Sequence, residues 1–338
     1  MRCLLAAVLF GASAPAASGL AGEMNFLVLA GVLYLGAGLA VLPAVLKHPP
    51  SRAGLKREWQ PALIAVIAGG AVGPALLVAG LARTTAASAS ILLNLELVAT
   101  VILAATIFGE HLGRRVVVGA AIVTAAGVAL VWEPGADLSI GALFIAAACV
   151  AWGVDNGVTA KIDQLSPETV VLLKGFVAGT ANVALGLTFG ATSTSISVAN
   201  VLFALAIGAA GYGASIVLWV KGARDLGAAR AQVIFATAPF IGVSIAWLWL
   251  GESVQTVQLV AVGLAAVGVA VTIESAHEHT HQHDPLDHEH EHSHDDQHHE
   301  HSHDDEGSVD GRHTHVHQHD AMAHSHAHVS DLHHRHPH

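Results

Sequence analysis

Long apolar runs separated by short polar turns fill the first 273 residues of the chain. A helix of about 20 apolar residues is long enough to cross a bilayer, and ten runs approach this length without a long soluble segment between them. The pattern therefore predicts an all-α polytopic membrane protein with ten transmembrane helices. The expected spans cover residues 3–22, 26–46, 60–80, 85–108, 115–132, 139–160, 167–190, 198–220, 228–250 and 256–273.

A different pattern begins at residue 274. The chain there is polar and alternates histidine with other residues, and only His48 and His111 of the 25 histidines precede it. Without apolar periodicity it cannot form a core, so we expect a disordered tail over 274–338. The chain is 53% hydrophobic and 12% charged. Its net charge of −11 lies in the tail, and this distribution excludes a nucleic-acid-binding surface.

The apolar body contains an internal duplication. Residues 78–110 return as residues 220–252 at an offset of 142, with several small residues and a closing Gly-Glu pair in register. Repetition at a fixed offset indicates duplicated units, which predicts two five-helix domains at 1–132 and 138–273. Five is an odd number, so the second copy must cross the membrane in the opposite direction to the first. Inverted five-helix repeats are typical of secondary transporters.

The two copies differ at one position that affects the backbone. Proline in a helix interior removes a hydrogen bond and breaks or kinks the helix. Pro239 lies inside the ninth span, whereas Leu97 occupies the matching place in the fourth. We therefore expect a helix break in the second copy only.

Lysine and arginine in the short loops indicate the orientation, because cytoplasmic loops carry the positive charge. With the N-terminus inside, the external loops hold only Arg83. We expect a multi-pass protein of the inner (plasma) membrane with both termini cytoplasmic. A cleavable signal peptide over residues 1–22 is the alternative for the first span, but its removal would cost the first repeat one helix. The basic residues of the internal loops are Lys47, Arg52, Lys56, Arg57, Arg114, Arg115, Lys161, Lys221 and Arg224.

Ionisable residues inside a span are costly and usually face the bundle interior or a water-filled cavity. Glu96 lies near the middle of the fourth span, with Asn94 two residues before it on another face. Glu96 is the first candidate for solute binding or proton coupling. A structural alternative is a protonated glutamic acid that is hydrogen-bonded to a neighbouring helix.

A second pair of charges lies in the sixth and seventh spans. Asp155 and Lys174 are at similar distances from the loop between these spans, so we expect them at equal depth in one helical hairpin. Opposite charges at equal depth neutralise each other. A structural ion pair and a transport site both remain open, and Asn156 shares this uncertainty.

The tail predicts metal binding. Imidazole is a good ligand for Zn, Ni, Co and Cu ions, and interleaved carboxylates attract cations. Physiological metal binding, proton buffering and low-complexity drift remain alternatives, and no other cofactor is expected. The candidate ligands are His277, His279, His281, His283, His288, His290, His292, His294, His298, His299, His301, His303, His313, His315, His317 and His319.

Several segments resemble EamA-type permeases of the drug/metabolite transporter superfamily. They are LLAAVLFGASAP in the first span, LNLELV in the fourth, AWGVDNGVTAKI in the sixth with LLKG after it, and the Gly-Glu pairs that end the fourth and ninth spans. The resemblance implies ten helices in two inverted repeats, and transport or exchange driven by a proton or solute gradient. It does not indicate which solute is moved.

These features favour a secondary transporter of a small metabolite or drug-like solute, with a cytoplasmic tail that binds divalent metal. A divalent transition-metal transporter is the first alternative, although the spans offer few soft ligands. A membrane-anchored metal store is the second. Enzymatic activity is not expected, because no nucleophile–base or phosphate-binding pattern is present. The expected partners are the lipid bilayer, a small solute, protons and metal ions, and a homodimer is an open option.

Overall fold

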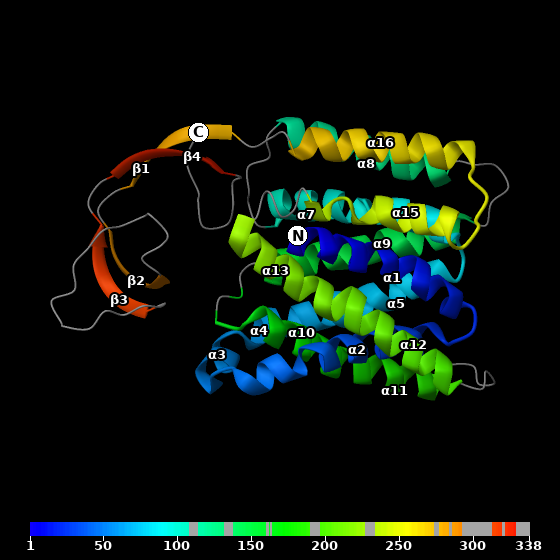
Figure 1. Ribbon diagram of the computed structural model, residues 1–338, viewed down its shortest axis with the longest axis horizontal. Coiled ribbons are helices and arrows are strands. Elements are labelled where there is room, and N and C mark those ends of the chain that lie inside the picture. Colours follow the sequence, from blue (N-terminus) through cyan, green and yellow to red (C-terminus); the bar gives the residue numbers. More distant parts are fainter. Residues whose placement is uncertain are drawn as a thin grey trace. The chain divides into compact units, whose positions relative to one another are not determined.

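The computed structural model describes residues 1–107, 114–131, 138–159, 162, 164–189, 197–226 and 234–273, and four strands between 277 and 328. Residues 1–275 belong to one compact unit and residues 276–329 form another. The first unit is helical (Figure 1). Its elements are α1 (Arg2–Ala21), α2 (Phe26–Lys47), α3 (Arg52–Arg57), α4 (Trp59–Ala65), η1 (Val66–Val72), α5 (Gly73–Leu81), α6 (Ala86–Leu92), α7 (Leu95–Thr106), α8 (Arg114–Val131), α9 (Leu138–Thr159), α10 (Pro167–Leu173), η2 (Lys174–Ala178), α11 (Gly179–Phe189), α12 (Val198–Gly208), η3 (Ala209–Ala214), α13 (Ser215–Leu226), α15 (Ala238–Leu248) and α16 (Thr256–Ile273).

Helices occupy each of the ten expected spans, but they differ in length. Among the described residues, seven helices are long and apolar enough to cross a membrane. Of the remaining three, α15 and α16 contain shorter apolar segments, and α8 begins with Arg114 and Arg115. The seven are Arg2–Ala21, Phe26–Lys47, Trp59–Leu81, Ala86–Leu103, Ile140–Thr159, Pro167–Phe189 and Val198–Trp219.

Polar residues at the turns set where several helices begin. The Asn25 carboxamide oxygen accepts from the first-turn amides of α2. The Thr85 and Ser166 hydroxyls cap α6 and α10 in the same manner. These side chains satisfy amide hydrogens that have no partner within their own helix, so the short turns of the sequence define the helix starts.

The third helix of each half contains a π-helical segment at the matching position. These segments are η1 and η3, and an offset of 142 superposes Gly69 in the first on Gly211 in the second. A π-turn inserts an extra residue into the helical repeat and is common at functional sites. A third π-helical segment, η2, interrupts the seventh expected span and begins at Lys174.

Both the fourth and the ninth expected spans contain a break. α6 ends at Leu92 and α7 begins at Leu95, while a turn over 236–237 precedes α15. The Asn94 amide donates to the Ile91 carbonyl at 2.9 Å, and the Thr237 hydroxyl donates to the Ile234 carbonyl at 2.6 Å. The expectation of a break beside Pro239 alone is therefore wrong.

Asparagine explains the break in the first copy. Its side chain offers the backbone a local hydrogen bond in place of the next helical turn. The amides of Asn94, Glu96 and Leu97 accordingly bond three residues back rather than four. Asn94 thus ends α6 without a proline.

Several contacts between the two halves occur twice. In the second occurrence, each residue or helix is replaced by its counterpart from the other half. Gly69 lies against Asp155, and Gly211 lies against Ser13, which is 142 residues before Asp155. At the helix level, α5 packs on α9 and its counterpart α13 packs on α1. Likewise α7 contacts α9, while α15 contacts α1. The helices that end the halves, α8 and α16, pack along each other (Figure 1).

In the tail the structure describes four strands. They are β1 (His277–His283), β2 (Leu286–His292), β3 (His313–His319) and β4 (Met322–His328), paired antiparallel as β1 with β4 and β2 with β3. The helices of residues 1–273 agree with the predicted all-α membrane body, and the strands are described where the sequence predicted a disordered tail. Alternation of two residue types, as in these four segments, has the period of a strand.

Candidate functional site

Asp155 and Lys174 form an ion pair inside the helical unit. The Lys174 ammonium lies 2.6 Å from both carboxylate oxygens of Asp155. Each side chain is only 10% exposed, and the Thr159 hydroxyl also donates to Asp155 at 2.9 Å. The structure therefore brings together the two charges that the sequence placed at equal depth.

Gly69 lies against the Asp155 side of this ion pair, on another helix. Its carbonyl accepts from the Tyr34 hydroxyl at 2.6 Å and from the Trp152 indole at 3.2 Å. A Cβ atom added to Gly69 would overlap the carboxylate of Asp155. The lack of a side chain in η1 therefore provides the space that Asp155 occupies beside Lys174.

Substitution of Gly69 by alanine is expected to destabilise the fold by about 1–3 kcal/mol, the usual range for an overpacked interior. The added methyl group must displace Asp155, Lys174 or the backbone of η1. Thermal unfolding of the purified variant in mild detergent measures the effect. Gly263→Ala is the matched control, because a Cβ there meets no atom within 4 Å. Equal melting temperatures for the two variants would contradict the packing described.

Glu96 lies beside the ion pair in a more open environment. The Asn156 amide donates to the Glu96 carboxylate at 2.9 Å and lies 3.4 Å from the Thr100 hydroxyl. Glu96 is half-buried and Asn156 is exposed. Two consecutive residues of α9 thus have different partners. Asp155 forms the mostly buried ion pair with Lys174, and Asn156 bonds to the more exposed carboxylate of Glu96 on α7.

Asn94 does not join this group. Its side chain is buried and bonds to the Ile91 carbonyl of its own chain segment. The structure therefore places Asn94 at the helix break, ahead of the first turn of α7 that carries Glu96. The described contact of Asn94 is therefore structural. The other four predicted site residues form two adjoining pairs, Asp155 with Lys174 and Glu96 with Asn156.

The sequence prediction missed the groups that surround the two pairs. Tyr34 and Trp152 lie within apolar runs, and no spacing sets them apart. Gly69 has no side chain and carries no chemical signal in the sequence. Thr100 gave no signal among the apolar residues of its span. A polar aromatic residue near the middle of a span is the one feature that could have singled out Tyr34.

Glu252 joins the end of the ninth expected span to the first half. Its two carboxylate oxygens accept from the amides of Ala86 and Ala87 at 2.8 and 2.9 Å, at the first turn of α6. Gln258 is buried nearby, and its amide donates to the Ser88 hydroxyl at 3.1 Å. In the sequence, Glu252 stands out only as part of the Gly-Glu pair that ends the ninth span. Its counterpart Glu110 lies outside the described residues.

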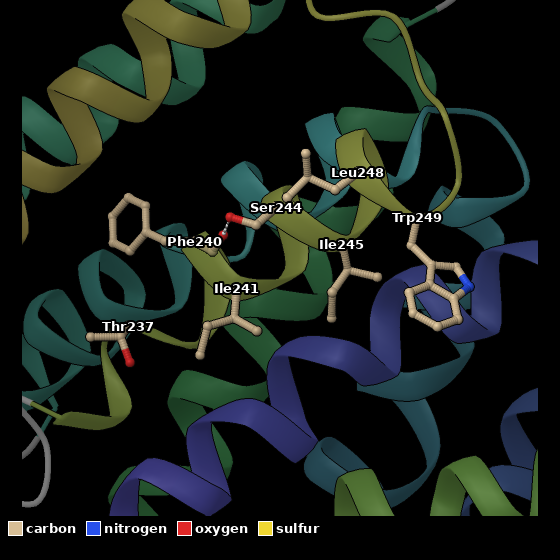
Figure 2. A pocket seen from close by; sticks show the side chains of 7 residues that line it. All are labelled: Thr237, Phe240, Ile241, Ser244, Ile245, Leu248 and Trp249. Atoms are coloured by element: carbon tan, nitrogen blue, oxygen red, sulfur yellow. Dashed lines mark hydrogen bonds between the residues drawn. The ribbon is translucent and has the colours of Figure 1, made fainter.

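An apolar groove of about 430 Å³ lies along α15 (Figure 2). The Ser244 and Thr237 hydroxyls in its lining bond to carbonyls of their own segment, and no lining residue is charged. Leu248 and Trp249 at one end are strongly exposed. The groove therefore has no charged group with which to orient a polar solute. Its lining residues are Thr237, Phe240, Ile241, Ser244, Ile245, Leu248 and Trp249.

Among the residues whose surroundings the structure describes, no group of three or more His, Cys, Asp or Glu could hold a metal ion. In the tail, the strand registers pair histidine with histidine at several places, such as His279 with His326 and His290 with His315. Five of the candidate metal ligands lie outside the described residues: His294, His298, His299, His301 and His303.

Comparison with known proteins places the chain in a family. A model of the EamA-like transporter family matches residues 2–132 and again residues 139–273. A protein from Methanothermobacter thermautotrophicus, described as an uncharacterized transporter, is 23% identical over 289 residues, which cover 79% of this chain and 84% of that protein. A solved crystal structure is similar in fold, with a TM-score of 0.60 and 19% identity over 80% of this chain and 96% of that one.

The double match confirms the resemblance to EamA-type permeases and shows that the chain holds two EamA repeats. With seven described helices able to cross a membrane, the chain is a multi-pass membrane protein and a transporter of a small solute. The chain belongs to the EamA-like transporter family.

Proposed function

We propose that this protein is a secondary transporter of the inner membrane. It moves a small metabolite or drug-like solute by alternating access, and a proton is coupled through Glu96. The observation that carries this proposal is the Glu96–Asn156 pair, an accessible carboxylate and its amide donor within two apolar helices. Carboxylates inside spans mark ion and substrate pathways.

Alternating access needs two halves that can move against each other. Ten helices in two inverted five-helix repeats would provide this arrangement. The exchanged contacts support it, since the Gly69–Asp155 approach reappears as Gly211–Ser13. The loop charges support opposite orientation of the halves, because basic residues follow the fourth span but not the ninth. Both termini would then face the cytoplasm.

The ion pair beside Glu96 would have a supporting role. Asp155 and Lys174 neutralise each other and are mostly buried, so they leave Glu96 as the carboxylate available for the transport cycle. Ser13 replaces Asp155 in the exchanged contact. The charged residue is therefore present in only one of the two exchanged contacts, although the packing of the helices is repeated.

Reconstitution of the full chain into liposomes tests the proposal. Extracts of small metabolites are loaded inside, and their loss is followed by mass spectrometry with and without an imposed proton gradient. Gradient-dependent loss of at least one solute is expected from the complete protein and not from empty liposomes. Loss of Zn²⁺ or Ni²⁺ alone would instead favour the metal-transporter alternative. Absence of any gradient-dependent flux would contradict the proposed function.

We place metal binding in the tail and transport in the helical unit. Deletion of residues 274–338 is therefore expected to leave solute flux within about twofold of the full chain, because these residues belong largely to a separate unit. The same deletion should abolish binding of divalent metal, since imidazole is the main ligand type and the tail holds most of the histidines. Liposome flux and calorimetric titration with Zn²⁺ measure the two effects. Complete loss of flux would show that the tail is needed for transport.

A further inference from the structure

The tail contains two antiparallel ribbons in which histidine stands opposite histidine. Strand β1 pairs with β4, and strand β2 pairs with β3. Each of the four strands has histidine in at least three of its alternate positions. Alternate residues of a strand lie on one face of the ladder, so each ribbon has one face that is composed largely of histidine.

Three consecutive histidine pairs define this face in each ribbon. The middle pair is His279 with His326 in the β1–β4 ribbon and His290 with His315 in the β2–β3 ribbon. A middle pair has a further histidine pair on both sides, whereas an outer pair has one on a single side. The outer pairs are His277 with His328, His281 with His324, His288 with His317 and His292 with His313.

The histidine rows end where the register changes partner type. His283 stands opposite Met322, and His319 stands opposite Leu286. Two adjacent pairs make a set of four histidines, so three pairs in a ribbon provide two such sets. Both sets include the middle pair of that ribbon.

The spacing of such a set suits a single metal ion. Residues directly opposite in an antiparallel ladder have Cβ atoms about 4.5–5.5 Å apart. Alternate residues along a strand are about 6.6 Å apart, at about 3.3 Å per residue. Imidazoles that extend from the corners of this rectangle can converge on one ion, at the Zn–N distance of about 2.0–2.1 Å.

The ribbons need a source of stability other than apolar burial. Their second face is mainly polar, and an isolated two-stranded ribbon is at best marginally stable in water. Protonated histidines opposite each other would add repulsion. A metal ion replaces this repulsion with ligand bonds across the strands, and its binding energy then stabilises the paired form. In the β2–β3 ribbon the second face consists of Asp287, Glu289, Glu291, Thr314, Val316 and Gln318.

We infer that each ribbon binds one divalent transition-metal ion, such as Zn²⁺, through four histidines that include its middle pair. This inference rests on the metal binding proposed for the tail and names its ligands and their number. Imidazole suits Zn, Ni, Co and Cu ions, whereas Mg²⁺ and Ca²⁺ prefer oxygen ligands. Binding of the ion and pairing of the strands are one event.

Zinc retention by the full-length protein tests the inference. The protein in mild detergent is loaded with Zn²⁺, equilibrated with nitrilotriacetate to empty weak sites and desalted, and the Zn²⁺ content per chain is measured. The middle-pair variant of the β1–β4 ribbon is His279→Ala with His326→Ala. Its matched control is the outer-pair variant His277→Ala with His328→Ala, which loses the same number of histidines from the same strands.

The unaltered chain is expected to retain about two Zn²⁺ ions, one for each ribbon. The middle-pair variant should retain about one, because its β1–β4 ribbon has no set of four histidines left. The outer-pair variant should retain about two, because the middle pair and the other outer pair remain.

The β2–β3 ribbon provides an independent comparison. His290→Ala with His315→Ala should lower the Zn²⁺ content to about half, whereas His292→Ala with His313→Ala should leave it unchanged. Equal Zn²⁺ content for the middle-pair and outer-pair variants in either ribbon would overturn the inference. That result is expected if the tail collects metal through histidines in any combination.

The proposed function can fail separately. If the unaltered chain retains Zn²⁺ but the two kinds of variant are equal, the tail binds metal as proposed and the paired sites are wrong. If the unaltered chain retains no Zn²⁺ and calorimetry without nitrilotriacetate also shows no binding, both metal proposals fail. Solute flux in liposomes is measured independently, so neither result alters the transport proposal.

Discussion

Substitution of Lys174 by methionine is expected to lower the free energy of unfolding by about 3–5 kcal/mol, because it leaves the buried Asp155 carboxylate without its partner. Methionine keeps most of the length of the side chain, so loss of packing contributes little. The remaining hydroxyl donor, Thr159, cannot neutralise a carboxylate. The temperature midpoint of unfolding in mild detergent, measured with the same detergent and lipid for each variant, reports the change.

The double variant Lys174→Met with Asp155→Asn separates charge from packing. Asparagine has the shape of aspartate and fits beside Gly69 without the charge. The double variant should recover most of the lost stability, since no uncompensated charge remains. If it is as unstable as Lys174→Met, the ion pair does not account for the loss. This comparison remains informative even if the single variant is too unstable to purify.

Substitution of Glu96 by glutamine is expected to abolish the pH dependence of solute flux. Glutamine can still accept the hydrogen bond from Asn156, so the fold should persist, but it cannot bind and release a proton. Flux driven by an imposed proton gradient should fall by at least about 100-fold, as expected when a group essential to coupling is removed. Fluxes in liposomes between pH 5.5 and 8.5 provide the measurement.

Asn156→Asp is a useful companion to Glu96→Gln. It alters the donor to Glu96 and places a second carboxyl at the same site. Neighbouring carboxyl groups share protons, so the pH profile should shift rather than flatten. An unaltered pH profile in Glu96→Gln would remove Glu96 from the coupling mechanism, whatever the result for Asn156→Asp.

The sequence predicted the parts of the fold that depend on local pattern. Apolar runs gave the helix positions, because a bilayer imposes their length. The pairing of Asp155 with Lys174 followed from counting residues to a shared loop, since a helical hairpin brings equal depths together. The repeat followed from an ungapped register of small residues, and the family match to both halves agrees with it.

The sequence could not predict features that arise from contacts between distant segments. The convergence of Tyr34 and Trp152 on the Gly69 carbonyl depends on how η1 packs against two other helices. Proline positions do not predict the break at Asn94, because a side-chain amide can replace a helical hydrogen bond as well.

Glu252 has a mechanical consequence for the whole protein. Its bidentate bonds to Ala86 and Ala87 tie the second half to the start of α6, and carboxylate bonds to helix amides are among the stronger hydrogen bonds in proteins. In the proposed transport cycle, these bonds would be a fixed point about which the two halves tilt. Glu96 lies farther along the fourth span, by a rise of about 15 Å at 1.5 Å per residue. A small tilt about the Glu252 bonds would therefore become a larger displacement at the Glu96 carboxylate.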